Sequence, residues 1–153
     1  MTNEISMANK ESIKEKFFST TGRIGRMTFF KRSVVLALIE VLLMTIVGFS
    51  AALWTFNSPD TDLITTAAMF IVGLLAIFPI YCLNVKRLHD LGKDETLAKI
   101  FAGLGIVGLA FNFSESTLAQ AIIIISSIIS LVFTVYLLFK KGENNANEYG
   151  NAQ

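Results

Sequence analysis

The stretch KRLHDLGK, residues 86–93, gathers most of the side chains in this sequence that could do chemistry. It contains the single histidine of the chain, His89, which is followed directly by Asp90 and flanked by Arg87 and Lys93. A histidine beside a carboxylate can act as a general acid or base, and arginine can bind phosphate through two parallel hydrogen bonds. The stretch therefore indicates either proton transfer or anion binding.

The rest of the sequence supplies little for catalysis or metal binding. His89 and Asp90 lack the further ligands of a metal site, and Cys82 is a lone cysteine inside an apolar run. There is no glycine-rich phosphate loop and no Gly-x-Ser-x-Gly turn. We therefore expect a non-enzymatic protein with no catalytic residue, metal or cofactor. In the structural alternative, the His-Asp-Leu-Gly stretch forms a turn, and Asp90 or Asp94 caps the next helix.

The composition indicates that membrane helices position these side chains. Of the 153 residues, 53% are hydrophobic and 16% are charged, whereas soluble domains carry roughly 25% charged residues. A spanning helix needs about 20 mainly apolar residues, because the hydrocarbon core is ~30 Å thick. We predict an all-α membrane protein with four transmembrane helices in one unit, at residues 33–56, 63–85, 96–113 and 117–139. The third stretch is short and rich in glycine, so a buried or re-entrant segment is its alternative.

The positions of the cations predict the orientation of these spans, because cytoplasmic loops are enriched in Lys and Arg. All thirteen lie in residues 1–32, 86–99 and 140–153, whereas the segments 57–62 and 112–117 contain only acidic charges. We therefore expect both termini on the cytoplasmic side. The net charge of +1 predicts no nucleic-acid partner.

The N-terminal segment, residues 1–32, has two interpretations. The stretch NKESIKEKFFS, residues 9–19, could form an amphipathic helix at the membrane interface with Ile13, Phe17 and Phe18 facing lipid. Alternatively, it is a solvated tail. A cleaved signal peptide is disfavoured, because the charged region and the apolar run that follows it are both too long.

Glu40 is an ionisable residue about seven residues into the first predicted span. Such a group is expensive in a membrane and is a functional candidate by default. It could serve a proton-coupled transporter of small molecules, in which a proton and a cationic substrate compete for the carboxylate. The structural alternative, which we favour, is an ion pair with Lys99 or a hydrogen bond to Asn84.

Three separated stretches carry a family resemblance. They are GRIGRMTFF (residues 22–30), KRLHDLGK (residues 86–93) and GENNANEYG (residues 142–150). In these stretches and across most of the chain from about Phe17, the sequence resembles the YhaH/YhaI-like family of small bacterial inner-membrane proteins, a domain of unknown function (DUF805). The resemblance implies a multi-pass protein of the bacterial cytoplasmic membrane and implies no activity. Two departures are the stretch DETLAKI after Lys93, where the family has tryptophans, and a tail without the usual proline.

All three motifs fall on the predicted cytoplasmic side, so they could form one polar cluster at the level of the lipid headgroups. Basic residues there attract acidic lipids by roughly 1 kcal/mol each. We therefore expect the cluster to bind acidic phospholipid headgroups of the bilayer, or a membrane or cytoplasmic protein partner; in the alternative, the cations only set the orientation. The candidate residues are Arg23, Arg26, Arg87, His89, Asp90, Lys93, Asn147 and Tyr149.

Overall fold

The computed structural model describes residues 12–55 and 62–150, which contain five α-helices. Apart from these helices, the described residues hold a single antiparallel bridge between Asn147 and Gly150. The helices are α2 (Ile13–Phe17), α3 (Arg26–Thr55), α4 (Asp62–Asp90), α5 (Thr96–Phe111) and α6 (Thr117–Phe139).

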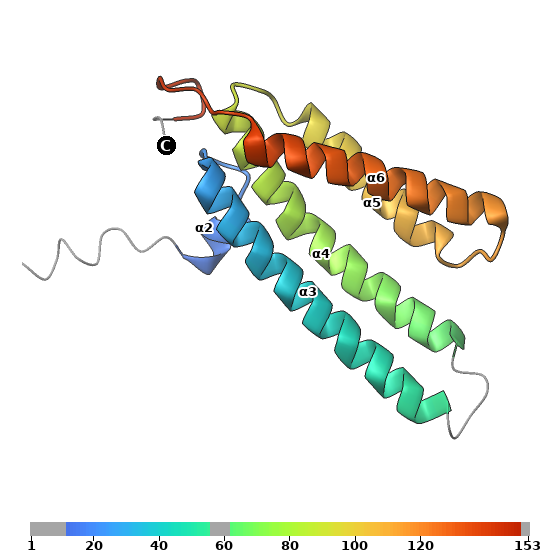
Figure 1. Cartoon of the computed structure of the whole chain (residues 1–153). Helices are drawn as coiled ribbons and strands as arrows, with labels where there is room; N and C mark the ends of the chain where they lie inside the picture. Colours follow the sequence, from blue (N-terminus) through green and yellow to red (C-terminus); the bar gives the residue numbers. More distant parts are fainter. Residues whose placement is uncertain (1–11, 56–61, 151–153) are drawn as a thin grey trace, which may run out of the picture.

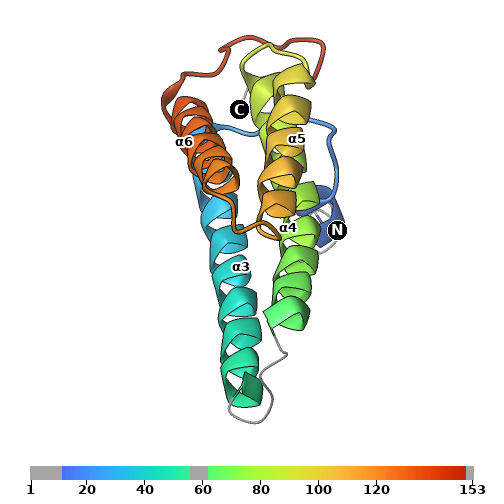
Figure 2. The ribbon, with the colours of Figure 1, turned by 90° about the vertical axis from the view of Figure 1, so that its right-hand side faces the viewer.

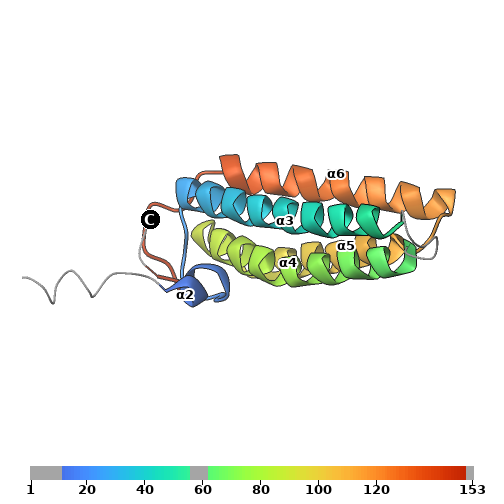
Figure 3. The ribbon, with the colours of Figure 1, turned by 90° about the horizontal axis from the view of Figure 1, so that it is seen from below.

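The four longer helices form two antiparallel hairpins, α3 with α4 and α5 with α6. Between the hairpins, α4 packs against α5 and α3 against α6. Figure 3 shows α3 and α6 in one layer and α4 and α5 in the other. The hairpins meet at one end of the bundle and separate toward the other (Figure 1). We call the end where they meet the polar end; it contains residues 12–32, 86–99 and 140–150 (Figures 1 and 2).

Three helices are long and apolar enough to cross a bilayer: Arg26–Trp54, Leu63–Asp90 and Thr117–Phe139. The protein is therefore a membrane protein, as predicted. Helix α5 has 16 residues, and at 1.5 Å per residue it is about 24 Å long, shorter than the ~30 Å hydrocarbon core. A fourth crossing by α5 stays a prediction.

Two helices extend beyond the predicted spans at the polar end. Helix α3 begins at Arg26, seven residues before residue 33, and α4 continues from residue 85 to Asp90. Hydropathy marks only the part of a helix that matches the hydrocarbon, whereas Lys, Arg and Leu also continue a helix in water. His89 and Asp90 therefore lie in the last helical turn of α4, and the loop turn expected at His-Asp-Leu-Gly begins only at Leu91. Gly92, whose φ is +65°, accommodates that turn.

The short helix α2 replaces the longer amphipathic helix expected at residues 9–19, of which residues 9–11 lie outside the described ranges. A capping box begins it: the Ser12 N–H donates to Glu15 Oε2 at 2.8 Å, and the Glu15 N–H donates to Ser12 Oγ at 3.2 Å. The first of these bonds lowers the pKa of Glu15. Phe17 and Phe18 lie against α3 and α4, and the rings of Phe18 and Phe78 are 6.3 Å apart.

The best-buried side chains gather at the polar end. Leu83, Val85 and Leu88 of α4 are at most 1% exposed and share a core with Phe29 of α3 and Leu137 of α6. Lipid tails give apolar helices little reason to associate inside the bilayer. The hairpins are therefore fixed where the helices approach water, and that end holds the candidate site.

Candidate functional site

A buried ion-pair cluster joins the first two motifs at the polar end. The carboxylate of Asp90 accepts from Arg23 Nη2 through Oδ1 at 3.2 Å and from Arg87 Nη1 through Oδ2. The three side chains are at most 3% exposed. We call them the Arg–Asp–Arg cluster; one carboxylate there neutralises one of two buried positive charges.

Arg87 joins the end of α6 to this cluster. Its Nε donates to the carbonyl of Leu137 at 2.8 Å, and its Nη2 donates to the carbonyl of Lys140. Its Nη1 also donates to the Ile24 carbonyl at 3.4 Å. The last carbonyls of a helix lack partners within the helix and favour positive charge. Arg87 therefore caps α6 while it binds the segment before α3.

Arg23 binds the third motif through main-chain carbonyls. Its Nη1 donates to Asn145 at 2.9 Å and to Gly150 at 3.2 Å, and its Nη2 donates to Glu143 at 2.8 Å. These bonds hold residues 143–150 over the end of α4. The Nε of Arg23 is buried and has no hydrogen-bond partner among the described residues.

His89 is held between the first and third motifs. Its Nδ1 lies 3.2 Å from the Gly22 carbonyl, an acceptor, so Nδ1 carries a proton. The His89 ring stacks on Tyr149, with centroids 3.8 Å apart and planes 3° from parallel. The Asn147 amide donates to the His89 carbonyl at 2.9 Å. Because Asp90 contacts arginines and His89 contacts a carbonyl, the adjacent pair does not form a His–carboxylate dyad.

Two glycines leave room for this arrangement. A Cβ at Gly142 would overlap the Asp90 carboxylate and lie 3.1 Å from the Asp90 carbonyl oxygen. A Cβ at Gly92 would overlap the Glu143 carboxylate. The glycine that opens the third motif and the one inside the second thus allow the tail to pack directly on α4.

The structure brings six of the eight candidate residues into this contact network, namely Arg23, Arg87, His89, Asp90, Asn147 and Tyr149. It leaves Arg26 and Lys93 exposed, and no side-chain partner is found for them within residues 12–55 and 62–150. The sequence placed all eight at a binding surface, but the burial of Arg23 and Arg87 gives these two a role inside the protein.

The expected cap on α5 is wrong. Its N-cap residue is Glu95, whose side chain makes no capping bond. Asp94 accepts instead from the Thr96 hydroxyl at 2.6 Å, and Asp90 is occupied by the arginines.

Lys86, Gly142 and Glu143 belong to the site although they are not among the eight candidate residues. Lys86 is 3% exposed, and its ammonium donates to the carbonyls of Glu15 and Lys16, so it attaches α2 to α4. Gly142 and Glu143 lie inside the third motif. Gly142 and Glu143 could have been found by taking the whole third motif as the candidate, and not its Asn147 and Tyr149 alone.

Six exposed cations lie at the polar end outside the buried cluster. No partner is found for their side chains among the described residues, and we call them the outer cations. They are Lys14, Arg26, Lys31, Lys93, Lys140 and Lys141.

Glu40 does not pair with Lys99, which corrects the favoured expectation. Lys99 Nζ lies 2.5 Å from Glu95 Oε1, and this exposed pair lowers the pKa of Glu95. Asn84 lines a cavity of about 210 Å³ together with Glu40 but makes no hydrogen bond to it. Within the described parts of the chain, the Glu40 carboxylate has no hydrogen-bonding or ionic partner.

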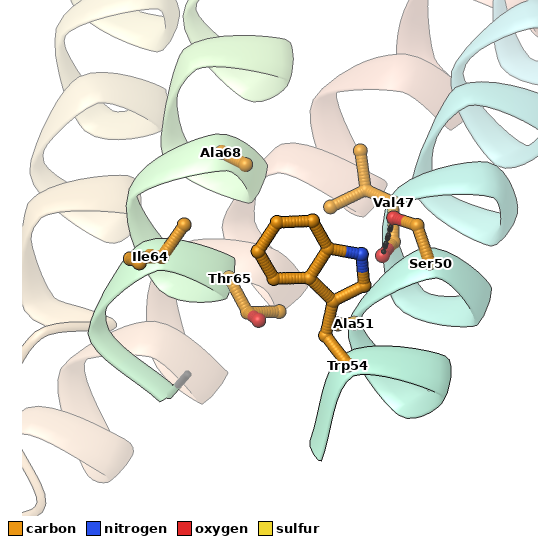
Figure 4. A pocket seen from close by; sticks show the side chains of 7 residues that line it. All are labelled: Val47, Ser50, Ala51, Trp54, Ile64, Thr65 and Ala68. Atoms are coloured by element: carbon orange, nitrogen blue, oxygen red, sulfur yellow. Dashed lines mark hydrogen bonds between the residues drawn. The ribbon is translucent and has the colours of Figure 1, made fainter. Parts of the chain in front are cut away.

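Other features offer less chemistry. No group of three or more His, Cys, Asp or Glu side chains suited to a metal occurs in the described residues, and Cys82 is buried and free. A small cavity lies between the far ends of α3 and α4, where the Trp54 indole extends from α3 toward Thr65 and Ala68 of α4 (Figure 4). Trp54 is 67% exposed, as expected for tryptophan at a membrane interface.

Comparison with known proteins gives one match. The model of a family described as a protein of unknown function (DUF805) matches residues 17–151. No curated protein and no solved structure matches the chain.

Proposed function

This chain belongs to the DUF805 family, and from that premise we propose that it is a four-span protein of the bacterial cytoplasmic membrane. Its polar end faces the cytoplasm and binds acidic phospholipid headgroups. One observation carries the proposal. The buried Arg–Asp–Arg cluster joins the segments of the polar end, and the outer cations lie exposed on these segments without an ion-pair partner among the described residues.

The buried cluster matters because headgroup binding needs several cations held at the same depth, that of the lipid headgroups. Arg26 begins α3, Lys93 follows α4, and Lys140 and Lys141 follow α6. Arg87 contacts the segments next to all three positions, through Ile24, Asp90 and Lys140. The cations are therefore carried by segments tied to one guanidinium group. Each contributes roughly 1 kcal/mol of attraction to an anionic leaflet.

A binding role fits the geometry better than a reaction. The nitrogens of Arg87 and Nδ1 of His89 are engaged with carbonyls or with Asp90. A general acid or base must reach its substrate's proton, whereas these groups join one segment of the chain to another.

The test compares lipids retained by the purified full chain. Nanodiscs with equal phosphatidylglycerol and phosphatidylcholine would be prepared with the wild type and with the variant Arg26→Gln, Lys93→Gln, Lys140→Gln, Lys141→Gln. Mass spectrometry of bound lipid should show at least a tenfold loss of preference for phosphatidylglycerol. The matched control, Arg26→Lys, Lys93→Arg, Lys140→Arg, Lys141→Arg, keeps the charge and should keep the preference.

Salt provides a second readout, because screening shortens from about 10 Å at 0.1 M to about 3 Å at 1 M. The wild-type preference should weaken across this range. Equal retention by wild type and the glutamine variant would overturn the proposal. A soluble protein that copurifies with the wild type, is lost from that variant, and leaves lipid preference unchanged would assign the surface to a protein partner.

A further inference from the structure

Glu40 is a charged side chain of α3 that takes no part in the site at the polar end. It lies fourteen residues after the start of α3, which places it about seven residues, or roughly 10 Å, into the predicted span. Its side chain is half-buried and lines cavities on two sides of α3. An ionisable group at this depth is expensive and needs a compensating partner.

The larger cavity is an apolar groove between α3 and α4, closed at the polar end by α2. Its volume is about 450 Å³, within the range of small-molecule sites. Aliphatic residues of α3 and α4 form its walls, and Phe17 of α2 and the next residue, Phe18, line it as well. Glu40 is the charged residue among its described lining residues.

The smaller cavity, on the α6 side, is more polar. Ser33, Asn84 and Thr134 line it together with Glu40. Thr134 Oγ1 already donates to the Ser130 carbonyl at 2.9 Å, so its oxygen is left as an acceptor. Neither cavity has Lys, Arg or His among the described residues that line it.

We propose that the groove is a binding site for a lipophilic monovalent cation, such as a hydrophobic ammonium or phosphonium compound. The positive centre lies against the Glu40 carboxylate, and the apolar body fills the groove between α3 and α4. Phe17 and Phe18 add aromatic faces, which attract cations. This ligand supplies the charge that the chain itself does not place beside Glu40, and its site is separate from the headgroup surface.

Tetraphenylphosphonium is the probe for this site, with binding to the full chain in phosphatidylcholine nanodiscs measured by titration calorimetry. The wild type should bind it at a single site, and Glu40→Gln should weaken binding at least tenfold. Glu95→Gln removes an exposed carboxylate outside the groove and should leave the affinity unchanged. Triphenylphosphine oxide, a neutral compound with similar rings, should bind far more weakly than the cation.

A groove-filling pair keeps the test decisive if Glu40→Gln alters folding. Ala76→Phe places a ring inside the groove and should abolish binding. Ala68→Phe makes the same change two turns earlier on α4, in the cavity beside Trp54 (Figure 4), and should leave binding intact. The proposal is overturned if the folded wild type does not bind the probe, if Glu40→Gln or Ala76→Phe binds it equally well, or if the neutral compound competes equally.

Discussion

Asp90 shows how one side chain can serve two buried cations. Its two oxygens face different guanidinium groups, one carried by the segment before α3 and one by α4 itself. Taking charges out of water is expensive, and the attraction repays the cost only when the geometry is good and further hydrogen bonds are made. Arg23 and Arg87 obtain those bonds from main-chain carbonyls of the tail and of α6. Asp90 therefore controls the contact of three segments.

The replacement Asp90→Asn should destabilise the protein by about 3–5 kcal/mol, the usual cost of leaving buried charges without their partner. The free energy of unfolding would be measured by SDS titration in mixed micelles. Asp94→Asn, which changes an exposed neighbour, should stay within about 0.5 kcal/mol of the wild type. Similar stabilities of the two variants would contradict the role assigned to Asp90.

The residue types at this end were readable in the sequence, but their roles were not. Motif and topology indicated that Arg23, Arg87, Asp90 and Tyr149 lie on one side of the membrane. Adjacency suggested a His89–Asp90 pair, yet successive residues of a helix point in directions about 100° apart. Such neighbours meet different partners, which only the packing of the other segments determines.

At the scale of elements, the contact between α4 and α5 depends on Gly73. A Cβ there would lie 2.6 and 2.9 Å from the two terminal carbons of Leu109. Helices in a bilayer associate through such close packing of small residues. Gly73 thus lets the first hairpin approach the second below the polar end.

Gly73→Leu should push α5 away and destabilise the bundle, and adding Leu109→Ala should restore part of the loss. We expect a coupling of about 0.5–3 kcal/mol in a double-mutant cycle based on SDS unfolding. Gly103→Leu is the control on α5, since a Cβ there meets nothing within 4 Å. Additive effects of Gly73→Leu and Leu109→Ala would show that this contact does not hold the hairpins together.

Helix boundaries were predictable where hydropathy and helix coincide. Helix α6 occupies the predicted residues 117–139, because a serine cap precedes it and the apolar run fills it. Helices α3 and α4 exceed their predicted spans, since the Arg and Lys at their polar ends continue the helix outside the hydrocarbon. The joining of three motifs by Arg23 and Arg87 was beyond prediction, as it depends on carbonyl positions in the loops.

At the scale of the whole molecule, the positive charges lie at the polar end of the bundle, and the opposite end carries acidic charge. The described Lys and Arg residues lie in segments 12–32, 86–99 and 140–150, which share the polar end (Figure 1). The turn between α5 and α6 contains Glu115 and no cation. This division supports a single orientation with the polar end in the cytoplasm.

Cysteine labelling in intact cells checks that orientation. In a Cys82→Ser background, a membrane-impermeant maleimide should label Ser114→Cys and leave Lys93→Cys unlabelled. Both positions are exposed, so Lys93→Cys should react once the cells are opened. Labelling of Lys93→Cys from outside, or equal labelling of both, would contradict the proposed topology.

The contacts of the two arginines also order the events of biosynthesis. Arg87 is made about fifty residues before its acceptors Leu137 and Lys140, and Arg23 precedes its acceptors Asn145 and Gly150 by more than 120 residues. Until those residues leave the ribosome, the two arginines beside the hairpin of α3 and α4 share the Asp90 carboxylate and lack these later carbonyl acceptors. Closure of the polar end therefore requires that residues through Gly150 have been translated, and a chain that ended before them would leave this end open and charged.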